Sequence, residues 1–474
     1  MKKRFISFVL AVVLVLGLIP ITETTMVANA VTERTVEGFI APIEPPDVDS
    51  IPISNREELE AIKDNLSGKY YLTRDIDLSG DEWVPIGDKT NPFAGVLDGQ
   101  GYIIHNMKIT GEGYEYNGLF GYALDVTIKN VGMVNANINI TTAQQKSFLE
   151  DYPVWAGGIS GVIATDEKYG SLGSKIINCH VKGKIEVHYP NWAGTVVGGI
   201  CGSIGIRSSI EFCYNTATIT SVNPNGNEVA SGADVGGICG FIGYGTINNC
   251  YNAGDISISI GSPSQNPPLT SSNAGATAGG ITASSGGGTT ATPLIITNCY
   301  NTGNIYVHGC TWSSSSRSFV NLTVAGISWG ANTISNCYNT GEIKSVISAP
   351  SNNPDLSAWV MGIGGYMNVN NCYNIGIVSS TFSGNISDNR VSGLSSVSWV
   401  TVTNSYCLNL YDSERGIQLT DSQMKNKEEF IGFDFENLWD ISPDVNNGYP
   451  FLRDINMLSK EANFFLRTIF VTAA

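Results

Sequence analysis

The sequence predicts an all-β protein whose fold is a right-handed parallel β-helix, a solenoid with short helical and aromatic caps. The first observation is a repeat: the string Asn-Cys-Tyr-Asn recurs at 249–252, 298–301, 336–339 and 371–374. The second is a Gly-Ile or Gly-Leu pair that alternates with this string, so that successive copies lie 31 to 49 residues apart. The third is the composition of the intervening runs, which are short, rich in Ile, Val and Thr, and broken by Gly and Asn. A period of this length built from strand-forming runs indicates stacked parallel strands.

Degenerate copies extend the repeat in both directions, at 178–181, 212–215 and 404–407. Rungs stacked ~4.8 Å apart would place equivalent residues of successive copies above one another. The repeats contain no ten-residue stretch with a helical period, which excludes a helical solenoid. A β-propeller is the alternative, but a blade needs four strands, whereas each unit here supplies one Gly-Ile strand and one Cys-Tyr strand.

Residues 1–30 predict a signal peptide. Lys2, Lys3 and Arg4 precede an apolar run at 5–19, and Ala28-Asn29-Ala30 offers small residues for cleavage. An uncleaved membrane anchor is the alternative, although the run is shorter than the ~20 residues that span a bilayer. We therefore expect export to the cell surface or the medium, with no transmembrane segment in the mature chain.

Composition and capping signals divide the remaining chain. Residues 31–50 carry prolines among acidic residues and predict an extended linker. Residues 51–117 would hold an N-terminal cap and the first rungs, with Ser54 and Glu57 as a capping box for a helix over about 55–66. The repeats fill 118–410, and 411–455 would form a C-terminal cap, leaving a tail at 456–474. In that cap, Thr420 and Gln423 would open a helical segment, and an aromatic cluster would seal the open end of the solenoid: Phe433, Phe435, Leu438, Trp439 and Phe451.

The charge balance restricts the partners. The 474 residues have a formal net charge of −16, and only 14% are charged. An acidic chain with few cations has little to neutralise phosphate groups, which excludes nucleic acid as a partner. We expect a monomer without a cofactor.

The Gly-Ile elements carry a resemblance to a known family. Gly118-Leu119-Phe120-Gly121, Gly199-Ile200-Cys201-Gly202 and Gly237-Ile238-Cys239-Gly240 resemble the namesake motif of the GLUG-motif repeat proteins, which are secreted bacterial β-helices. The resemblance covers residues 51 to 455. It implies a surface or secreted β-helix, often attached to adhesins or to metallopeptidases that cleave immunoglobulin, and it implies no single activity. The chain has four His and no His-Glu-x-x-His, so it lacks the peptidase motif.

Six cysteines share one repeat position and predict a ladder of small, polarizable side chains inside the helix: Cys179, Cys213, Cys250, Cys299, Cys337 and Cys372. Disulfides are the alternative in an exported chain. Side chains on stacked parallel strands point the same way and would have to leave their rotamers to bridge, so we expect free thiols. There is no Cys-x-x-Cys spacing, and we predict no metal site.

Aromatic side chains are the candidate ligand contacts. A Tyr follows every ladder Cys except Cys179, and it would point outward because neighbouring residues of a strand face opposite sides. Such a row would either stack on itself and shield the strands or offer a platform for sugar rings. Tryptophans on the polar inserts extend the set, and Asn residues after each Tyr would pair in an internal amide ladder. The candidate binding residues are Trp155, Trp192, Trp312, Trp359, Trp399, Tyr251, Tyr300, Tyr338 and Tyr373.

These features favour a non-catalytic adhesion or binding protein that contacts a polysaccharide or another cell surface. A polysaccharide lyase or glycoside hydrolase is the rival, because β-helices host both classes, and such enzymes need neighbouring carboxylates. The weak catalytic candidates are Asp75, Asp77 and Asp98, whose alternative role is in strand ends and turns. A structural stalk is the third possibility.

Overall fold

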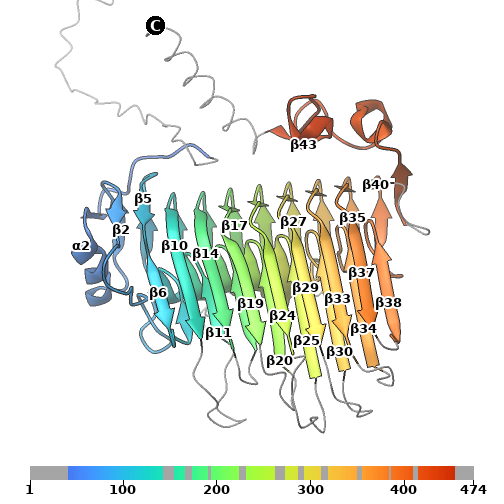
Figure 1. The fold of residues 1–474 in the computed structure, drawn as a ribbon. Coiled ribbons are helices and arrows are strands. Elements are labelled where there is room, and N and C mark those ends of the chain that lie inside the picture. Colours follow the sequence, from blue (N-terminus) through green and yellow to red (C-terminus); the bar gives the residue numbers. More distant parts are fainter. Residues whose placement is uncertain are drawn as a thin grey trace, which may run out of the picture. The chain divides into compact units, whose positions relative to one another are not determined.

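The computed structural model describes residues 41–141, 154–165, 173–189, 194–223, 231–261, 273–286, 293–310, 319–349, 355–383, 386–408 and 415–453. These residues form a right-handed parallel β-helix, which confirms the predicted fold class: strands of successive rungs pair in parallel along every face (Figure 1). Equivalent residues of successive copies pair directly, as Tyr251 does with Tyr300 and Tyr300 with Tyr338.

The first sheet has 11 strands, one from each rung. From Leu97 to Val369 its inward residues form a column of aliphatic side chains, and the strand residues directly before and after each of them lie on the outward side. The strands are β1 (Ile51–Ile53), β2 (Lys69–Leu72), β4 (Val96–Asp98), β9 (Thr127–Lys129), β13 (Lys175–Ile177), β17 (Ser208–Glu211), β22 (Gly245–Asn248), β27 (Leu294–Thr297), β31 (Thr333–Ser335), β35 (Asn368–Asn370) and β39 (Thr401–Thr403).

The second sheet contains the Cys-Tyr-Asn part of each repeat, and a short Tyr-Asn strand precedes a longer strand in the later rungs. The strands are β3 (Ile76–Asp77), β5 (Ile103–His105), β6 (Lys108–Gly111), β10 (Gly132–Thr141), β14 (His180–His188), β18 (Tyr214–Asn215), β19 (Thr218–Asn223), β23 (Tyr251–Asn252), β24 (Ile256–Ile260), β28 (Tyr300–Asn301), β29 (Ile305–Cys310), β32 (Tyr338–Asn339), β33 (Ile343–Ser348), β36 (Tyr373–Asn374), β37 (Val378–Ser383), β40 (Tyr406–Leu408) and β41 (Ile417–Leu419).

The third and fourth sheets lie before and after the Gly-Ile element. The third sheet comprises β7 (Tyr116–Asn117), β11 (Val154–Gly157), β15 (Thr195–Gly198), β20 (Ser231–Gly236), β25 (Asn273–Gly279), β30 (Phe319–Ala325), β34 (Asp355–Met361) and β38 (Asp388–Ser392). The fourth comprises β8 (Phe120–Leu124), β12 (Ser160–Ala164), β16 (Cys201–Ile204), β21 (Cys239–Ile242) and β26 (Thr282–Ser285).

Each letter of the Asn-Cys-Tyr-Asn string has its own structural role. The first Asn has a positive φ, 52° at Asn249, a conformation that Asn adopts more readily than most residues. The Cys points into the core, and the Tyr stacks on the Tyr of the next rung. The last Asn is buried and confirms the predicted amide ladder: Asn252 Nδ2 donates to Asn301 Oδ1 at 2.8 Å. The backbone that packs against this Asn side chain must belong to a glycine. A Cβ on Gly280, for example, would lie 2.5 Å from Asn301 Cγ.

A short helix stands at the N-terminal end of the described solenoid, as α2 (Arg56–Glu60) followed by the 3-10 turn η1 (Ala61–Asp64). The expected capping pair is shifted by one residue. Asn55 is the N-cap, because its extended backbone lets its side chain accept from Glu58 N at 2.9 Å. Glu58, and not Glu57, reaches back to accept from Ser54 N.

Residues 415–453 form an irregular segment that we call the C-terminal cover. It contains the 3-10 turns η3 (Gln423–Lys425), η4 (Lys427–Glu429) and η5 (Asn446–Gly448), and the antiparallel pair β42 (Trp439–Asp440) and β43 (Phe451–Leu452). Thr420 and Gln423 cap each other reciprocally, as expected. The expectation that its aromatic residues seal the end of the solenoid is wrong. They lie along the side of the later rungs, where Trp439 is 6.0 Å from the rings of both Tyr338 and Tyr373.

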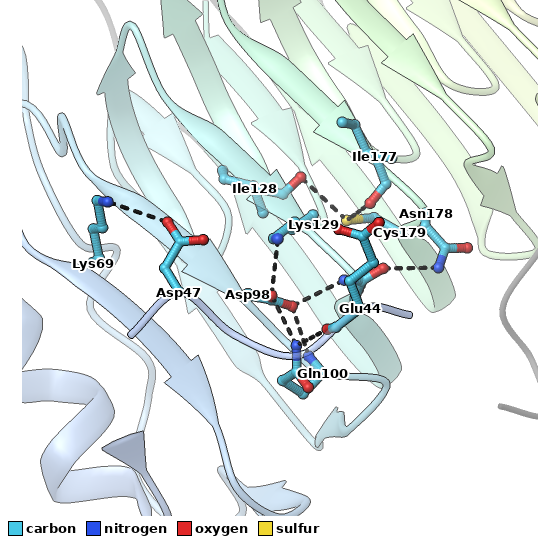
Figure 2. Close-up of polar contacts among 11 residues, drawn as sticks. Glu44, Asp47, Lys69, Asp98, Gln100, Ile128, Lys129, Ile177, Asn178 and Cys179 are labelled. Carbon is cyan, nitrogen blue, oxygen red and sulfur yellow. Dashed lines mark hydrogen bonds and ion pairs between the residues drawn. The ribbon is translucent and has the colours of Figure 1, made fainter. Parts of the chain in front are cut away.

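The chain on the N-terminal side also lies against the rungs. Asn178 exchanges two hydrogen bonds of 3.0 Å with the backbone of Ala41, and Gln100 Nε2 donates to Glu44 O at 2.7 Å (Figure 2). Residues 41–44 thus run across turns of the early rungs in which Gln100 and Asn178 both have a positive φ.

Candidate functional site

An outward-facing row on the third sheet combines aromatic and polar side chains in one register. Each member pairs with the next across adjacent rungs, and the residues between them point into the core. We call it the corner row, and its members are Tyr116, Trp155, Val196, Asp234, Thr277, Thr323, Trp359 and Arg390.

The corner row lies at the bend between the third and fourth sheets, on its solvent side. The Gly-Ile element turns the chain from the third sheet into the fourth, and outward side chains of the two sheets then touch. The rings of Tyr116 and Tyr122 meet edge to face at 5.1 Å, and Ser284 Oγ donates to Asp234 Oδ2 at 2.8 Å. Because outward residues can meet only across a bend that is concave toward solvent, the row and its partners form the two walls of this bend.

Glycine permits the sharpness of the bend. A Cβ on Gly161 would lie 2.7 Å from Asn117 N, and a Cβ on Gly202 would lie 2.9 Å from Val196 O. Both approaches are closer than ordinary contacts allow, so the backbones of the two walls are nearly in contact there.

The first aromatic site of the corner row is a stacked pair. The rings of Tyr116 and Trp155 lie 5.2 Å apart at an interplanar angle of 28°. Tyr116 is buried at 8% exposure beneath its neighbours, whereas Trp155 is half-buried and keeps part of its ring in solvent. Trp155 is thus held against Tyr116 with part of its side chain in solvent, an arrangement that suits contact with an apolar ring or sugar face.

The second aromatic site lies five rungs later, about 24 Å away at ~4.8 Å per rung. Trp359 is half-buried, its Nε1 donates to Asp388 Oδ2 at 3.0 Å, and the Arg390 guanidinium lies 4.5 Å from its ring centre. Trp329 packs edge-on against it at 5.2 Å. Asp388 also pairs with Arg390, and this hydrogen bond lowers the pKa of the carboxyl. These contacts therefore fix the orientation of the Trp359 ring and favour the charged form of the Asp388 carboxyl.

Between the aromatic sites the row offers hydrogen-bonding groups. Asp234 is half-buried, and burial raises the pKa of its carboxyl. Thr277 and Thr323 follow it along the row. Sequence reasoning missed Tyr116, Asp234 and Arg390. Of the three, only Asp234 precedes a Gly-Gly pair, Gly236-Gly237, so only this residue is found by counting back from such pairs.

The predicted tryptophans do not all lie on one surface. Trp155 and Trp359 share the corner row. Trp399 is 55% exposed and lies beside Tyr366 at 6.2 Å, outside the row. Trp192 and Trp312 lie outside the described residues.

The tyrosine row is largely buried, and the expected solvent exposure is wrong for most of it. Its rings stack almost parallel, as Tyr214 and Tyr251 do at 4.8 Å and 1°. Tyr300, Tyr338 and Tyr373 are only 7%, 2% and 0% exposed because the C-terminal cover packs on them. These three residues are therefore removed as ligand contacts, and only Tyr251 of the four predicted keeps a half-buried ring.

The six ladder cysteines are buried and free. They do more than fill space, since each backbone N–H donates to the sulfur of the next rung, as Cys179 N does to Cys213 Sγ at 3.4 Å. The ladder ends where Cys372 N donates to Ser405 Oγ at 3.1 Å. Burial raises the pKa of the Cys179, Cys213 and Cys250 thiols. Protonated, enclosed thiols are poor nucleophiles, which favours a structural role for these three cysteines.

The three candidate catalytic carboxylates are occupied by local contacts. Asp98 is 2% exposed, pairs with Lys129 at 3.1 Å and accepts from Gln100 and Asn130 (Figure 2). Asp77 accepts from Asn106 Nδ2 at 2.8 Å, which lowers the pKa of its carboxyl, and from Ser79. Asp75 accepts from Ile103 N at 2.8 Å. All three connect a turn to itself or to the next rung.

Two further observations concern the described residues alone. They contain no cluster of three or more His, Cys, Asp or Glu side chains suited to hold a metal ion. Among them, too, no helix has the length and apolar character required to cross a membrane.

Comparison with known proteins identifies a similar solved structure. Neither an established protein family nor a curated protein matches the sequence. The crystal structure of a protein from Bacteroides ovatus, described as a candidate immunoglobulin A1 protease, is 21% identical, with a TM-score of 0.44 over 85% of this chain and 92% of that one.

Proposed function

We propose that this protein is an exported, non-catalytic binding protein that holds an extended polysaccharide along the corner row. The single observation that supports the proposal most strongly is the register of Trp155 and Trp359, two half-buried indoles on one outward line in a concave bend. Partly exposed Trp side chains suit a binding surface, because each combines a large apolar ring with a polar N–H.

The spacing of the row favours a polymer over a small molecule. Two aromatic sites about 24 Å apart, at ~4.8 Å per rung, exceed the reach of a single sugar but match an extended chain of several. The polar stretch between them, Asp234, Thr277 and Thr323, offers one hydrogen-bonding side chain per rung. A repeating ligand with an apolar ring face and many hydroxyl groups complements this order of side chains.

The chemistry favours binding over turnover. Asp234 is the single carboxylate in the row, and its side-chain partners are the hydroxyl groups of Ser284 and Thr277. Glycosidases need two carboxyl groups on opposite sides of the scissile bond. The signal peptide predicted at 1–30 supports a location outside the cytoplasm, where such polymers occur.

The test incubates the purified protein with a panel of soluble and insoluble polysaccharides and measures protein depletion and released sugar ends in the same tubes. Depletion without released ends supports the proposal. Released ends would overturn the non-catalytic assignment, and absence of both signals across the panel would overturn the polysaccharide assignment.

Variants locate the site. Trp155→Ala and Trp359→Ala are expected to lose retention on the polysaccharide that depletes the parent protein. Tyr306→Ala is the matched control, because Tyr306 is a 41% exposed aromatic residue on the outward side of β29, in the second sheet. Equal loss in all three variants would contradict the placement of the site.

A further inference from the structure

The tyrosine row is buried at both ends and only half-buried in the middle. Its members in order are His180, Tyr214, Tyr251, Tyr300, Tyr338, Tyr373 and Tyr406. His180 is 5% exposed at one end, and the four tyrosines at the other end are 7% exposed or less. Tyr214 and Tyr251 between them are half-buried, and Phe212 is half-buried beside them. We call these three aromatic residues the open window.

The C-terminal cover stops at the edge of the open window. Trp439 packs on Tyr338 and Tyr373, and the Tyr373 hydroxyl donates to Pro450 O at 2.5 Å. Tyr214, Tyr251 and Phe212 border the same apolar cluster as partly buried members. The open window is therefore a continuation of an interface that the chain already makes with its own C-terminal residues.

The described cover ends at a fixed point. Arg453 is held by three backbone carbonyls, of Trp439, Glu436 and Phe435, at 2.8, 3.2 and 2.6 Å. It follows β43, the part of the cover drawn nearest the middle rungs (Figure 1). Residues 454–474 start from this point and contain a strongly apolar stretch, Phe464-Phe465-Leu466.

The length and the apolar character of residues 454–474 both favour them as the segment that occupies the open window. Extended chain advances ~3.3 Å per residue and rungs are ~5 Å apart, so a few residues pass from Tyr300 to Tyr214. Burying three consecutive large apolar residues lowers the free energy of the folded chain, and so does shielding the aromatic row from water. The covered tyrosines are already packed by Phe and Trp side chains of the neighbouring segment.

We propose that residues 454–474 dock on the open window and complete the cover of the tyrosine row, with Phe464, Phe465 and Leu466 against Tyr251, Tyr214 and Phe212. The inference is independent of the polysaccharide proposal, because it concerns a different face of the solenoid. A second copy of the chain and a separate hydrophobic partner are the competing occupants.

The experiment measures maleimide labelling of a cysteine placed at the open window. The ten native cysteines are buried, so the introduced thiol reports alone. Tyr251→Cys in the full chain is compared with the same substitution combined with Phe464→Ser, Phe465→Ser and Leu466→Ser. Thr246→Cys, on the exposed side of β22, is the control in both backgrounds.

The proposal predicts that the three serine substitutions speed labelling at Tyr251→Cys at least tenfold and leave Thr246→Cys unchanged. Equal rates at Tyr251→Cys in the two backgrounds would overturn it. Protection that appears only as protein concentration rises would overturn it in favour of a second copy. Tyr214→Cys repeats the measurement one rung away, so that a folding defect of one variant leaves the test decisive.

Discussion

The backbone N–H of Cys250 donates to the Sγ of Cys299 on the next rung, 3.4 Å away. The same bond recurs from Cys213 to Cys250, so each thiol accepts from the rung before it. The thiols of the cysteine ladder therefore act as hydrogen-bond acceptors. Each ladder Cys directly follows a residue with positive φ, at which the chain turns.

The acceptor role predicts different outcomes for two substitutions of one thiol. Cys250→Val keeps the apolar volume but leaves Cys213 N–H buried without an acceptor, at a cost of about 1–3 kcal/mol. Cys250→Ser keeps an acceptor, as Ser405 does for Cys372 N–H, and should cost less. Thermal denaturation of the two variants side by side tests the order. A more stable valine variant would show that the thiol acts only as filler.

The amide ladder predicts a large effect at one buried position. Asn301 accepts from Asn252 Nδ2 at 2.8 Å and donates to Asn339 Oδ1 at 2.7 Å. Asn301→Ala leaves both neighbours short of a partner, and the expected loss of unfolding free energy is about 2–4 kcal/mol. Thr302→Ala, an exposed neighbour, should change stability by less than about 0.5 kcal/mol. Similar losses in the two variants would contradict the ladder's role.

The close packing at the Gly-Ile bend predicts contrasting effects for two nearby glycines. A Cβ on Gly280 would lie 2.0 Å from Gly326 O, whereas a Cβ on Gly275 has nothing within 4 Å. Gly280→Ala should destabilise the protein by about 3 kcal/mol, because backbone must move to admit the methyl group. Gly275→Ala should be neutral within about 0.5 kcal/mol. Chemical denaturation measures both, and tolerance of Gly280→Ala would refute the bend geometry.

Asp234 predicts the sign of one pH effect. Burial raises the pKa of its carboxyl in the folded state above the ordinary 3.8, so the folded protein takes up this proton before the unfolded chain does. The contribution of Asp234 to stability is therefore present at low pH and is lost as pH rises through the folded-state pKa. Relative to Asp234→Asn, the parent protein should gain stability as pH falls from 7 to 4. A constant difference between the two proteins would show that Asp234 is not desolvated.

Much of the solenoid could be predicted because each repeat marks its own register. Once the Asn-Cys-Tyr-Asn copies are aligned, the inward Cys, the stacked Tyr and the paired Asn252 and Asn301 follow from strand alternation alone. The burial of Tyr338 and Tyr373 could not be predicted this way. It depends on Trp439, a residue of an irregular segment whose docking leaves no period in the sequence.

Only part of the candidate site could be predicted from the sequence. Trp155 and Trp359 were selected as exposed aromatic residues, but their shared line became visible only once each rung was in register. The contact of Tyr116 with Tyr122 depends on how far the Gly-Ile element bends the chain, an angle that pairing rules do not contain. Trp399 carries a similar sequence signal and lies outside the row beside Tyr366.

The measurement that tests the central claim most directly is the affinity of the protein for the retained polysaccharide, compared among the parent, Trp155→Ala, Trp359→Ala, the double variant and Tyr306→Ala. The account predicts a loss of about tenfold for each tryptophan, from ~1.4 kcal/mol of lost stacking, with a larger loss in the double variant. Tyr306→Ala should bind as the parent does. Unchanged affinity in the double variant, with its fold intact, would contradict the corner row as the binding site.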